Sequence, residues 1–243
     1  MQHKASFALL TIGQFLTSFS AFLGIYFIMS QFRAVEGFTF GEVMICFSVV
    51  LTAFAIAECF ARGFDMFSST IGNGEFDRIL IRPKNIIFQV LASKTEFTRV
   101  GRLFQAVLSL SISVSYGDIH WNIMKIITVF LMIACGTVVF SALFAVGAAV
   151  CFFSTESLEV LNIFTDGGRE FGRYPLSVYG KDILRFYTFV VPMALFQYYP
   201  FLYIIGRTDN LIYALSPIFS LLSVIPVAIL WKIGLKHYKS TGS

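Results

Sequence analysis

The feature that most constrains this chain is a series of long stretches without a single charged side chain. They cover residues 5–32, 43–57, 103–117, 126–155, 186–206 and 210–231. A helix needs about 20 mostly apolar residues to cross a bilayer, and the two shortest stretches reach that length when a few flanking residues are added. Charged residues make up only 13% of the chain, against roughly 25% in a soluble domain. We therefore expect an all-α, polytopic membrane protein.

These stretches predict a single transmembrane domain over residues 1–243. Its six membrane-spanning helices are expected at about 7–31, 41–61, 100–119, 125–153, 183–205 and 210–232. Two cytoplasmic loops follow from this division, one over 62–99 and one over 154–182. The region 197–217 contains Pro200 and Pro217, and prolines inside helices either kink them or break them. Two kinked helices and a re-entrant hairpin are both open for this region.

The distribution of basic residues orients the predicted helices. With the N-terminus inside, the inside segments hold fifteen of the eighteen Lys and Arg residues, and the outside connections hold only Arg33, Lys125 and Arg207. Basic residues accumulate in cytoplasmic loops, so both termini are expected on the cytoplasmic side of the membrane. We expect this membrane to be a bacterial plasma membrane. Because the basic residues cluster beside spans rather than along a solvated face, nucleic acid is not an expected partner, whereas membrane lipid is.

The sequence contains no motif of a catalytic, nucleotide or metal site. The glycines of Gly72-Asn73-Gly74 are not followed by the Lys-Ser/Thr of a phosphate-binding loop. The four cysteines show no CxxC spacing, and the three histidines are scattered. We therefore expect that the chain is not an enzyme and binds no cofactor or metal itself.

Glu58 is the one carboxylate near the end of an otherwise apolar span. An ionisable group in a span is a candidate for function. Arg62 follows one helical turn later, where the two side chains could pair. A structural ion pair at the end of the span is the preferred interpretation, and a role in proton or substrate movement is the alternative.

The loop between the second and third spans contains a short amphipathic pattern. Glu75 and Asp77 favour a helix N-terminus, Phe76, Ile79 and Leu80 form an apolar stripe, and Pro83 ends the segment. Arg78 and Arg82 lie beside the stripe. The pattern predicts a short helix across the cytoplasmic face that could bind a partner; the alternative is a basic loop that only contacts lipid headgroups.

Three segments of the sequence resemble those of a known family. The segments Gly-Glu-Phe-Asp-Arg-Ile-Leu-Ile-Arg-Pro (74–83), Phe-Phe-Ser-Thr-Glu-Ser-Leu-Glu (152–159) and Tyr-Pro-Leu-Ser-Val-Tyr (174–179) are similar to those of six-span permease subunits of ABC-2 type transporters. The likeness covers most of the chain from about residue 15. The brief N-terminal lead departs from the interfacial elbow helix that many such permeases carry.

The resemblance implies half of an ATP-binding cassette exporter. A second permease subunit, identical or related, would complete the substrate path, and separate ATPase subunits would bind ATP and Mg. The segment Glu75–Pro83 would be the coupling helix that docks on the ATPase, with Glu75, Phe76, Asp77, Arg78, Ile79, Leu80, Arg82 and Pro83 as its contact residues. Glu156, Glu159, Tyr174 and Pro175 would lie near a cytoplasmic gate.

Two other functional classes remain open. An ion- or proton-coupled secondary carrier should carry ionisable residues deeper in its spans than Glu58. A non-transport integral membrane protein is the other alternative. The substrate is not predicted.

Overall fold

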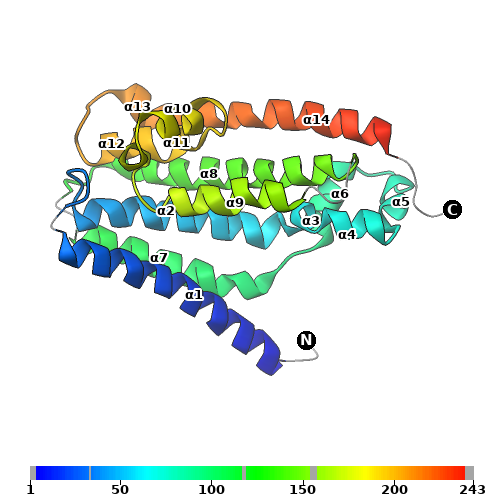
Figure 1. Ribbon diagram of the computed structural model, residues 1–243, viewed down its shortest axis with the longest axis horizontal. Helices are drawn as coiled ribbons and strands as arrows, with labels where there is room; N and C mark the ends of the chain where they lie inside the picture. Colours follow the sequence, from blue (N-terminus) through cyan, green and yellow to red (C-terminus); the bar gives the residue numbers. More distant parts are fainter. Residues whose placement is uncertain (1–3, 33, 117–118, 154–157, 239–243) are drawn as a thin grey trace.

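The computed structural model describes residues 4–32, 34–116, 119–153 and 158–238, and within them it is a helical bundle. The long helices lie side by side along the long axis of the molecule (Figure 1). They are α1 (Lys4–Gln31), α2 (Phe40–Phe60), α7 (Val100–Tyr116), α8 (Ile123–Val150), and the continuous pair α13 (Leu211–Ser220) and α14 (Val224–His237), joined by the 3-10 turn η3 (Leu221–Ser223). Among the described residues the only β-type pairing is an isolated bridge between Val35 and Phe38. The expected all-α class is confirmed.

Four helical segments among the described residues are long and apolar enough to cross a membrane: Lys4–Gln31, Phe40–Phe60, Ile123–Val150 and Leu211–His237. Each coincides with a predicted span. Helix α7 also begins where the third span was predicted, at Val100, and its 17 residues are about 26 Å long at 1.5 Å per residue. That is slightly less than the roughly 30 Å hydrocarbon core.

The bundle has two distinct ends. The connections over residues 34–39, 119–122 and 205–210 lie at one end, on the left in Figure 1, and α5 (Glu75–Leu80) lies at the other, which we call the α5 end. Helix α1 begins on the side of the α5 end and runs toward the opposite end. Helix α14 runs back toward the α5 end. The start of α1 and the end of α14 thus point to the same side of the bundle; that this side is cytoplasmic stays a prediction.

The predicted fifth span, 183–205, is not one helix. It is divided into α10 (Lys181–Phe189), α11 (Met193–Phe196) and α12 (Tyr198–Ile204). The first break falls at Pro192, which has no N–H to continue the helix. Helix α12 has only seven residues, about 10 Å, and packs against α13 after a turn at Gly206, whose φ is 77°. The region 197–217 is therefore a helical hairpin of α12 and the first part of α13; whether it is re-entrant or part of two spans stays a prediction.

Proline 217 lies inside α13 without breaking it. A proline at this position leaves the carbonyl of Tyr213, four residues earlier, without its usual N–H partner. The hydroxyl of Ser216 donates to that carbonyl at 2.7 Å and also to the carbonyl of Leu195 at 2.9 Å. The side chain of Ser216 thus satisfies the freed carbonyl, as a helix in lipid requires.

The predicted loop 154–182 contains a helix that lies within the bundle instead. Helix α9 (Leu158–Phe171) runs beside α8 and contacts α2 (Figure 1). Close packing fixes it there, since a Cβ on Gly168 would lie 2.8 Å from Sδ of Met193, and one on Gly172 would lie 2.8 Å from a methyl of Val50. This helix was not predicted from the sequence. Its charged residues form pairs with one another, as described below; that the connection is cytoplasmic stays a prediction.

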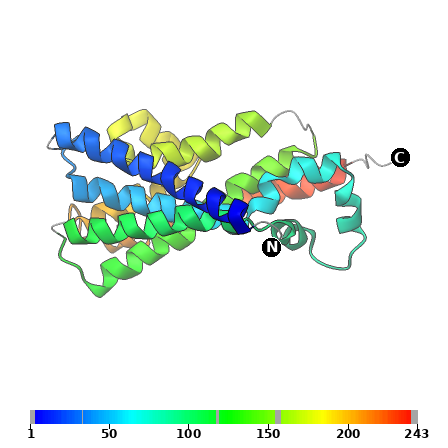
Figure 2. The same ribbon diagram turned by 90° about the horizontal axis from the view of Figure 1, so that it is seen from below.

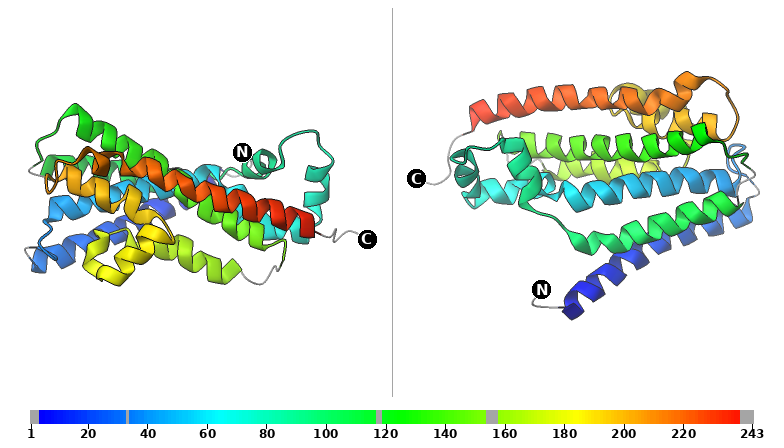
Figure 3. Two further views of the ribbon diagram at one scale, coloured as in Figure 1. Left: turned by 90° about the horizontal axis from the view of Figure 1, so that it is seen from above. Right: turned by 180° about the vertical axis from the view of Figure 1, so that it is seen from behind.

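Helix α1 is the most loosely held of the long helices. It lies along α7, as Figure 3 shows from behind, and crosses the rest of the bundle obliquely in Figure 2. Its buried residues are Ser18, Ile25 and Met29. The helix is continuous from Lys4 to Gln31. Most of its apolar surface is thus available to lipid or to another subunit.

The crossing of α1 and α7 depends on Gly101. A Cβ at this position would lie 2.0 Å from the carbonyl oxygen of Thr11, and backbone cannot yield as a side chain can. We expect Gly101→Ala to lower the free energy of unfolding by about 1–3 kcal/mol through overpacking, measured by SDS titration in mixed micelles with circular dichroism. Gly24→Ala in α1 is the matched control, because its new Cβ would meet nothing within 4 Å. Equal stability of the two variants would show that the helices do not approach so closely.

Candidate functional site: the α5 end

The segment between α2 and α7 builds the α5 end from short helices. They are α3 (Arg62–Asp65), α4 (Phe67–Gly72), α5, α6 (Ile86–Ser93) and the 3-10 turn η1 (Phe97–Arg99). Helices α3 and α4 continue from α2, α5 lies at the extreme tip, and α6 returns against α3 (Figures 1 and 3). The close return requires Gly63, because a Cβ there would lie 1.8 Å from the carbonyl oxygen of Val90.

The predicted short helix is present at the tip. Gly74 precedes it with a left-handed backbone, φ 70°, which glycine adopts without a steric penalty. Glu75 and Asp77 then occupy the first turn, where carboxylates interact favourably with the helix dipole. The helix ends at Leu80, three residues before Pro83.

The apolar stripe of α5 faces the protein itself, not an open surface. Phe76 is fully buried and Ile79 is 8% exposed. The ring of Phe76 contacts Phe67 at 5.0 Å and Tyr238 at 4.9 Å between centroids. The expectation that Phe76 and Ile79 present a free face to a partner was therefore wrong, because residues distant in sequence cover them.

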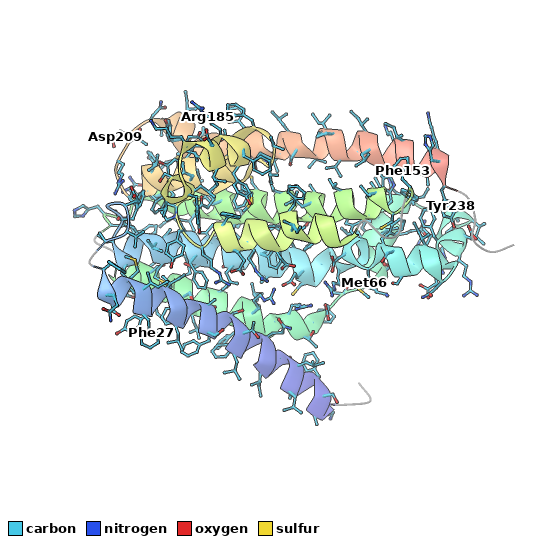
Figure 4. All side chains as sticks on the ribbon, in the orientation of Figure 1. Phe27, Met66, Phe153, Arg185, Asp209 and Tyr238 are labelled. Atoms are coloured by element: carbon cyan, nitrogen blue, oxygen red, sulfur yellow. The ribbon has the colours of Figure 1, made fainter. Side chains whose placement is uncertain are left out.

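Phe76 belongs to a group of rings that we call the aromatic cluster. Its members are Phe64, Phe67, Phe76, Phe152, Trp231 and Tyr238. Phe152 follows the end of α8, Trp231 belongs to α14, and Tyr238 comes directly after α14. The hydroxyl of Tyr238 also donates to a carboxylate oxygen of Asp77 at 3.0 Å. Figure 4 shows Tyr238 and Phe153 beside α5 at this end. Helix α5 is thus attached to the ends of two membrane-spanning helices.

The outward face of this tip consists of those residues of the segment 75–83 that are exposed. Ile81 is 83% exposed and Leu80 is 36% exposed. Glu75, Arg78, Arg82 and Pro83 are exposed around them. Sequence reasoning missed Ile81, which ends the helix as its C-cap. Ile81 and Leu80 thus form a small apolar surface that is ringed by charges at the tip.

The predicted ion pair between Glu58 and Arg62 is absent. Glu58 pairs with Arg102 of α7, and with Arg99 at 3.6 Å. Arg62 pairs instead with Asp65 and, at 3.0 Å, with Glu96. Helix α2 ends at Phe60 and Ala61 leaves helical geometry, with φ −104° and ψ 14°. The turn that would place Arg62 above Glu58 is therefore not formed.

Arg102 is the partner of Glu58 that the sequence argument missed. Its side chain is 7% exposed, and besides Glu58 it donates to Oε1 of Gln14 at 2.8 Å, which joins α1, α2 and α7. A signal was available, because Arg102 lies inside the predicted span 100–119, and an arginine inside a span usually has a partner or a function.

The gate candidates do not lie together near the α5 end. Tyr174 packs in the half of the bundle that contains Phe38, Phe201 and Ile204, which is nearer the opposite end, and Pro175 beside it is buried. The carbonyl of Tyr174 accepts a hydrogen bond from the buried Gln197 at 2.9 Å. Glu156 lies outside the described residues. Of Glu159 only the backbone, in α9, is described.

Over the described parts of the chain, no group of three His, Cys, Asp or Glu side chains is arranged to hold a metal ion. Comparisons with curated proteins and with solved structures gave no match. A family model described as ABC-2 family transporter protein matches residues 15–242, nearly the whole chain. The chain therefore belongs to the ABC-2 family of transporter proteins, as a multi-pass membrane component that is not itself catalytic.

Proposed function

We propose that the chain is the permease subunit of an ATP-binding cassette exporter of the bacterial cytoplasmic membrane. It forms half of the substrate path and pairs with a second permease subunit, identical or related. Separate ATPase subunits bind ATP and Mg and dock on the tip formed by α5 and the residues after it. Family membership supports the transport role, and the geometry of α5 supports the docking role.

The docking proposal depends on one observation: the tip formed by α5 and Ile81 has a buried side and an exposed side. Phe76 is completely buried in the aromatic cluster, whereas Ile81, five residues later, is 83% exposed at the tip. An exposed isoleucine of this size has no role in the stability of the chain itself. Surrounded by Arg78 and Arg82, it suits a pocket in an ATPase whose rim is acidic.

The aromatic cluster supplies the mechanical connection. Protein interiors are close-packed and transmit displacement instead of absorbing it. A displacement of α5 therefore reaches α8 through Phe152 and α14 through Trp231 and Tyr238. Closure of docked ATPase subunits would in this way change the positions of spans that border the substrate path.

The test is Ile81→Asp in the full chain, expressed with the ATPase that co-purifies with the wild-type protein. Loss of a central apolar contact costs 2 kcal/mol or more at many interfaces, so we expect co-purification and stimulated ATP hydrolysis to fall by at least about tenfold. Because Ile81 is exposed, the variant should fold and insert normally, which gel filtration checks.

Ile123→Asp is the matched control. Ile123 is 73% exposed and begins α8 at the opposite end of the bundle, so it should keep the ATPase bound. Docking on the α5 tip is refuted if Ile81→Asp retains a stimulated ATPase, or if no ATPase accompanies the wild-type chain.

A further inference from the structure

A polar cavity of about 320 Å³ lies where α2, α3, η1, α7, α8 and α9 meet. We call it the charged chamber. The chamber is lined by Phe54, Glu58, Arg62, Asp65, Arg99, Arg102, Phe144, Thr165, Asp166 and Arg169. Seven of these ten residues are charged, which is unusual for a space inside a membrane-protein bundle.

Three of the four arginines around the chamber each have at least one carboxylate partner outside their own helix. Arg102 and Arg99 hold the buried Glu58, as described above, and Arg99 also pairs with Glu96 at 3.2 Å. Arg62 bridges Asp65 and Glu96. These groups form one continuous network that joins α2, α3, η1 and α7, so their positive charges are already matched.

Arg169 is different. Its carboxylate partners are both on its own helix, Asp166 at 3.4 Å and Glu170 at 3.0 Å. Their side chains are 58% and 42% exposed, and water screens exposed pairs strongly. The guanidinium of Arg169 itself is only 23% exposed and lies 4.9 Å from the ring centroid of Phe54. It is therefore the least neutralised charge of the chamber.

A second, smaller cavity adjoins the same side chains. It has a volume of about 40 Å³ and shares Arg102 and Arg169 with the charged chamber, while Ser18 of α1 and Phe47, Val50 and Leu51 of α2 line much of the remainder. Arg173 also lines this smaller cavity. Arg102 and Arg169 thus lie between the two spaces.

We propose that the charged chamber binds an anionic phosphate or carboxylate group, with Arg169 as its principal ligand. Nε and Nη2 of Arg169 donate to Oε1 of Glu170 at 3.3 and 3.0 Å. The edge formed by Nη1 and Nη2 can therefore donate two parallel hydrogen bonds to such a group, and the face of Phe54 holds the plane of the guanidinium in place. The hydroxyl of Thr165 lies on α9 four residues earlier, and so on the same face of the helix. A cation is disfavoured, because the carboxylates of Glu58 and Asp65 already have arginine partners.

The anionic group could belong to an amphiphile or to a small free ion. The statement that the anionic group is part of the transported substrate rests on the proposed function. The binding of the anion does not rest on it, because binding is measured on the chain without an ATPase. Failure of Ile81→Asp to release the ATPase would leave this result intact, and the reverse also holds.

The experiment uses the full chain in phosphatidylcholine nanodiscs and ³²P-labelled octyl phosphate in equilibrium dialysis, with empty nanodiscs subtracted. We expect saturable binding of about one probe per chain, and an increase in Kd of at least about tenfold for Arg169→Gln, because charge-assisted hydrogen bonds are lost. Arg185→Gln is the matched control. Arg185 has the same i,i+3 pairing, with Asp182, but is 73% exposed on α10, away from the chamber (Figure 4), and its Kd should match that of wild type.

Competition identifies the source of the anion. Displacement by inorganic phosphate as efficiently as by unlabelled octyl phosphate would assign the site to a free anion, and much weaker displacement would assign it to an amphiphile. Equal displacement by octyl glucoside, which has the same tail and no charge, would overturn the proposal. The absence of saturable binding would also overturn it, and so would equal Kd values for Arg169→Gln and Arg185→Gln. If Arg169→Gln does not elute as folded protein, Arg169→Lys serves instead, and an unchanged Kd there would exclude bidentate binding.

Discussion

Replacing Arg102 with alanine is expected to lower the free energy of unfolding by about 3–5 kcal/mol, because it leaves Glu58 without its main partner in a buried site. Both side chains are 7% exposed. Arg62→Ala should cost only about 1 kcal/mol, since Asp65 and Glu96 are partly exposed to water. SDS titration of the purified chain in mixed micelles, followed by circular dichroism, gives both values under one set of conditions.

A double variant separates the ion pair from simple packing. Breaking a buried pair is costly mainly because one charge remains unpaired, whereas replacing both partners with apolar residues is often neutral. Glu58→Leu combined with Arg102→Leu should therefore be more stable than Arg102→Ala alone. If Arg62→Ala and Arg102→Ala cost the same, the pairing would be shared equally between the two arginines and the arrangement described here would be incorrect.

The second large effect is expected at Phe76. Truncation of a fully buried phenylalanine to alanine removes its contacts and leaves a cavity, at a cost of about 3–5 kcal/mol. For Phe76→Ala the loss should appear first in α5, because that helix is held to α8 and α14 through this ring and the Tyr238–Asp77 hydrogen bond. Hydrogen exchange measured by mass spectrometry should show α5 losing protection before the long helices do.

Ile81→Ala provides the control for Phe76→Ala. Its side chain is 83% exposed, so the isolated chain should keep its stability within about 0.5 kcal/mol. The two substitutions should thus have opposite consequences: Phe76→Ala destabilises the permease itself, and changes at Ile81 affect only the partner. Similar stabilities for the two variants would mean that the aromatic cluster does not anchor α5.

Sequence reasoning located most of the long helices because their stretches carry no charge. The stretches in α1, α2, α8 and α13–α14 needed no tertiary information, and the start of α7 followed from them. Helix α9 was missed for the opposite reason. A count of charges assigns this segment to a loop because it contains Asp166, Arg169, Glu170 and Arg173. In the structure these side chains pair with one another beside α2 and α8. A hydropathy pattern contains no information on such pairing.

The same limit explains the errors at the candidate site. The amphipathic pattern predicted a short helix near residues 75–83. Of its predicted apolar stripe, Phe76 and Ile79 are buried whereas Leu80 is exposed. Which face of that helix meets the protein depends on Phe152 and Tyr238, which are far away in the sequence. Likewise, the partner of Glu58 could be guessed only among near neighbours, and Arg62 was the nearest cation. Local spacing predicts elements, whereas tertiary contacts determine partners.

The contact between Glu58 and Arg102 also has a consequence during biosynthesis. The two residues are 44 positions apart, so α2 leaves the ribosome well before the arginine that neutralises its carboxylate has been made. Helix α1 buries few residues and can enter lipid alone. Helix α2 can be released fully into the hydrocarbon only at a cost until α7 follows. The first three long helices are thus expected to leave the insertion machinery as a group, with the arrival of Arg102 as the event that completes it.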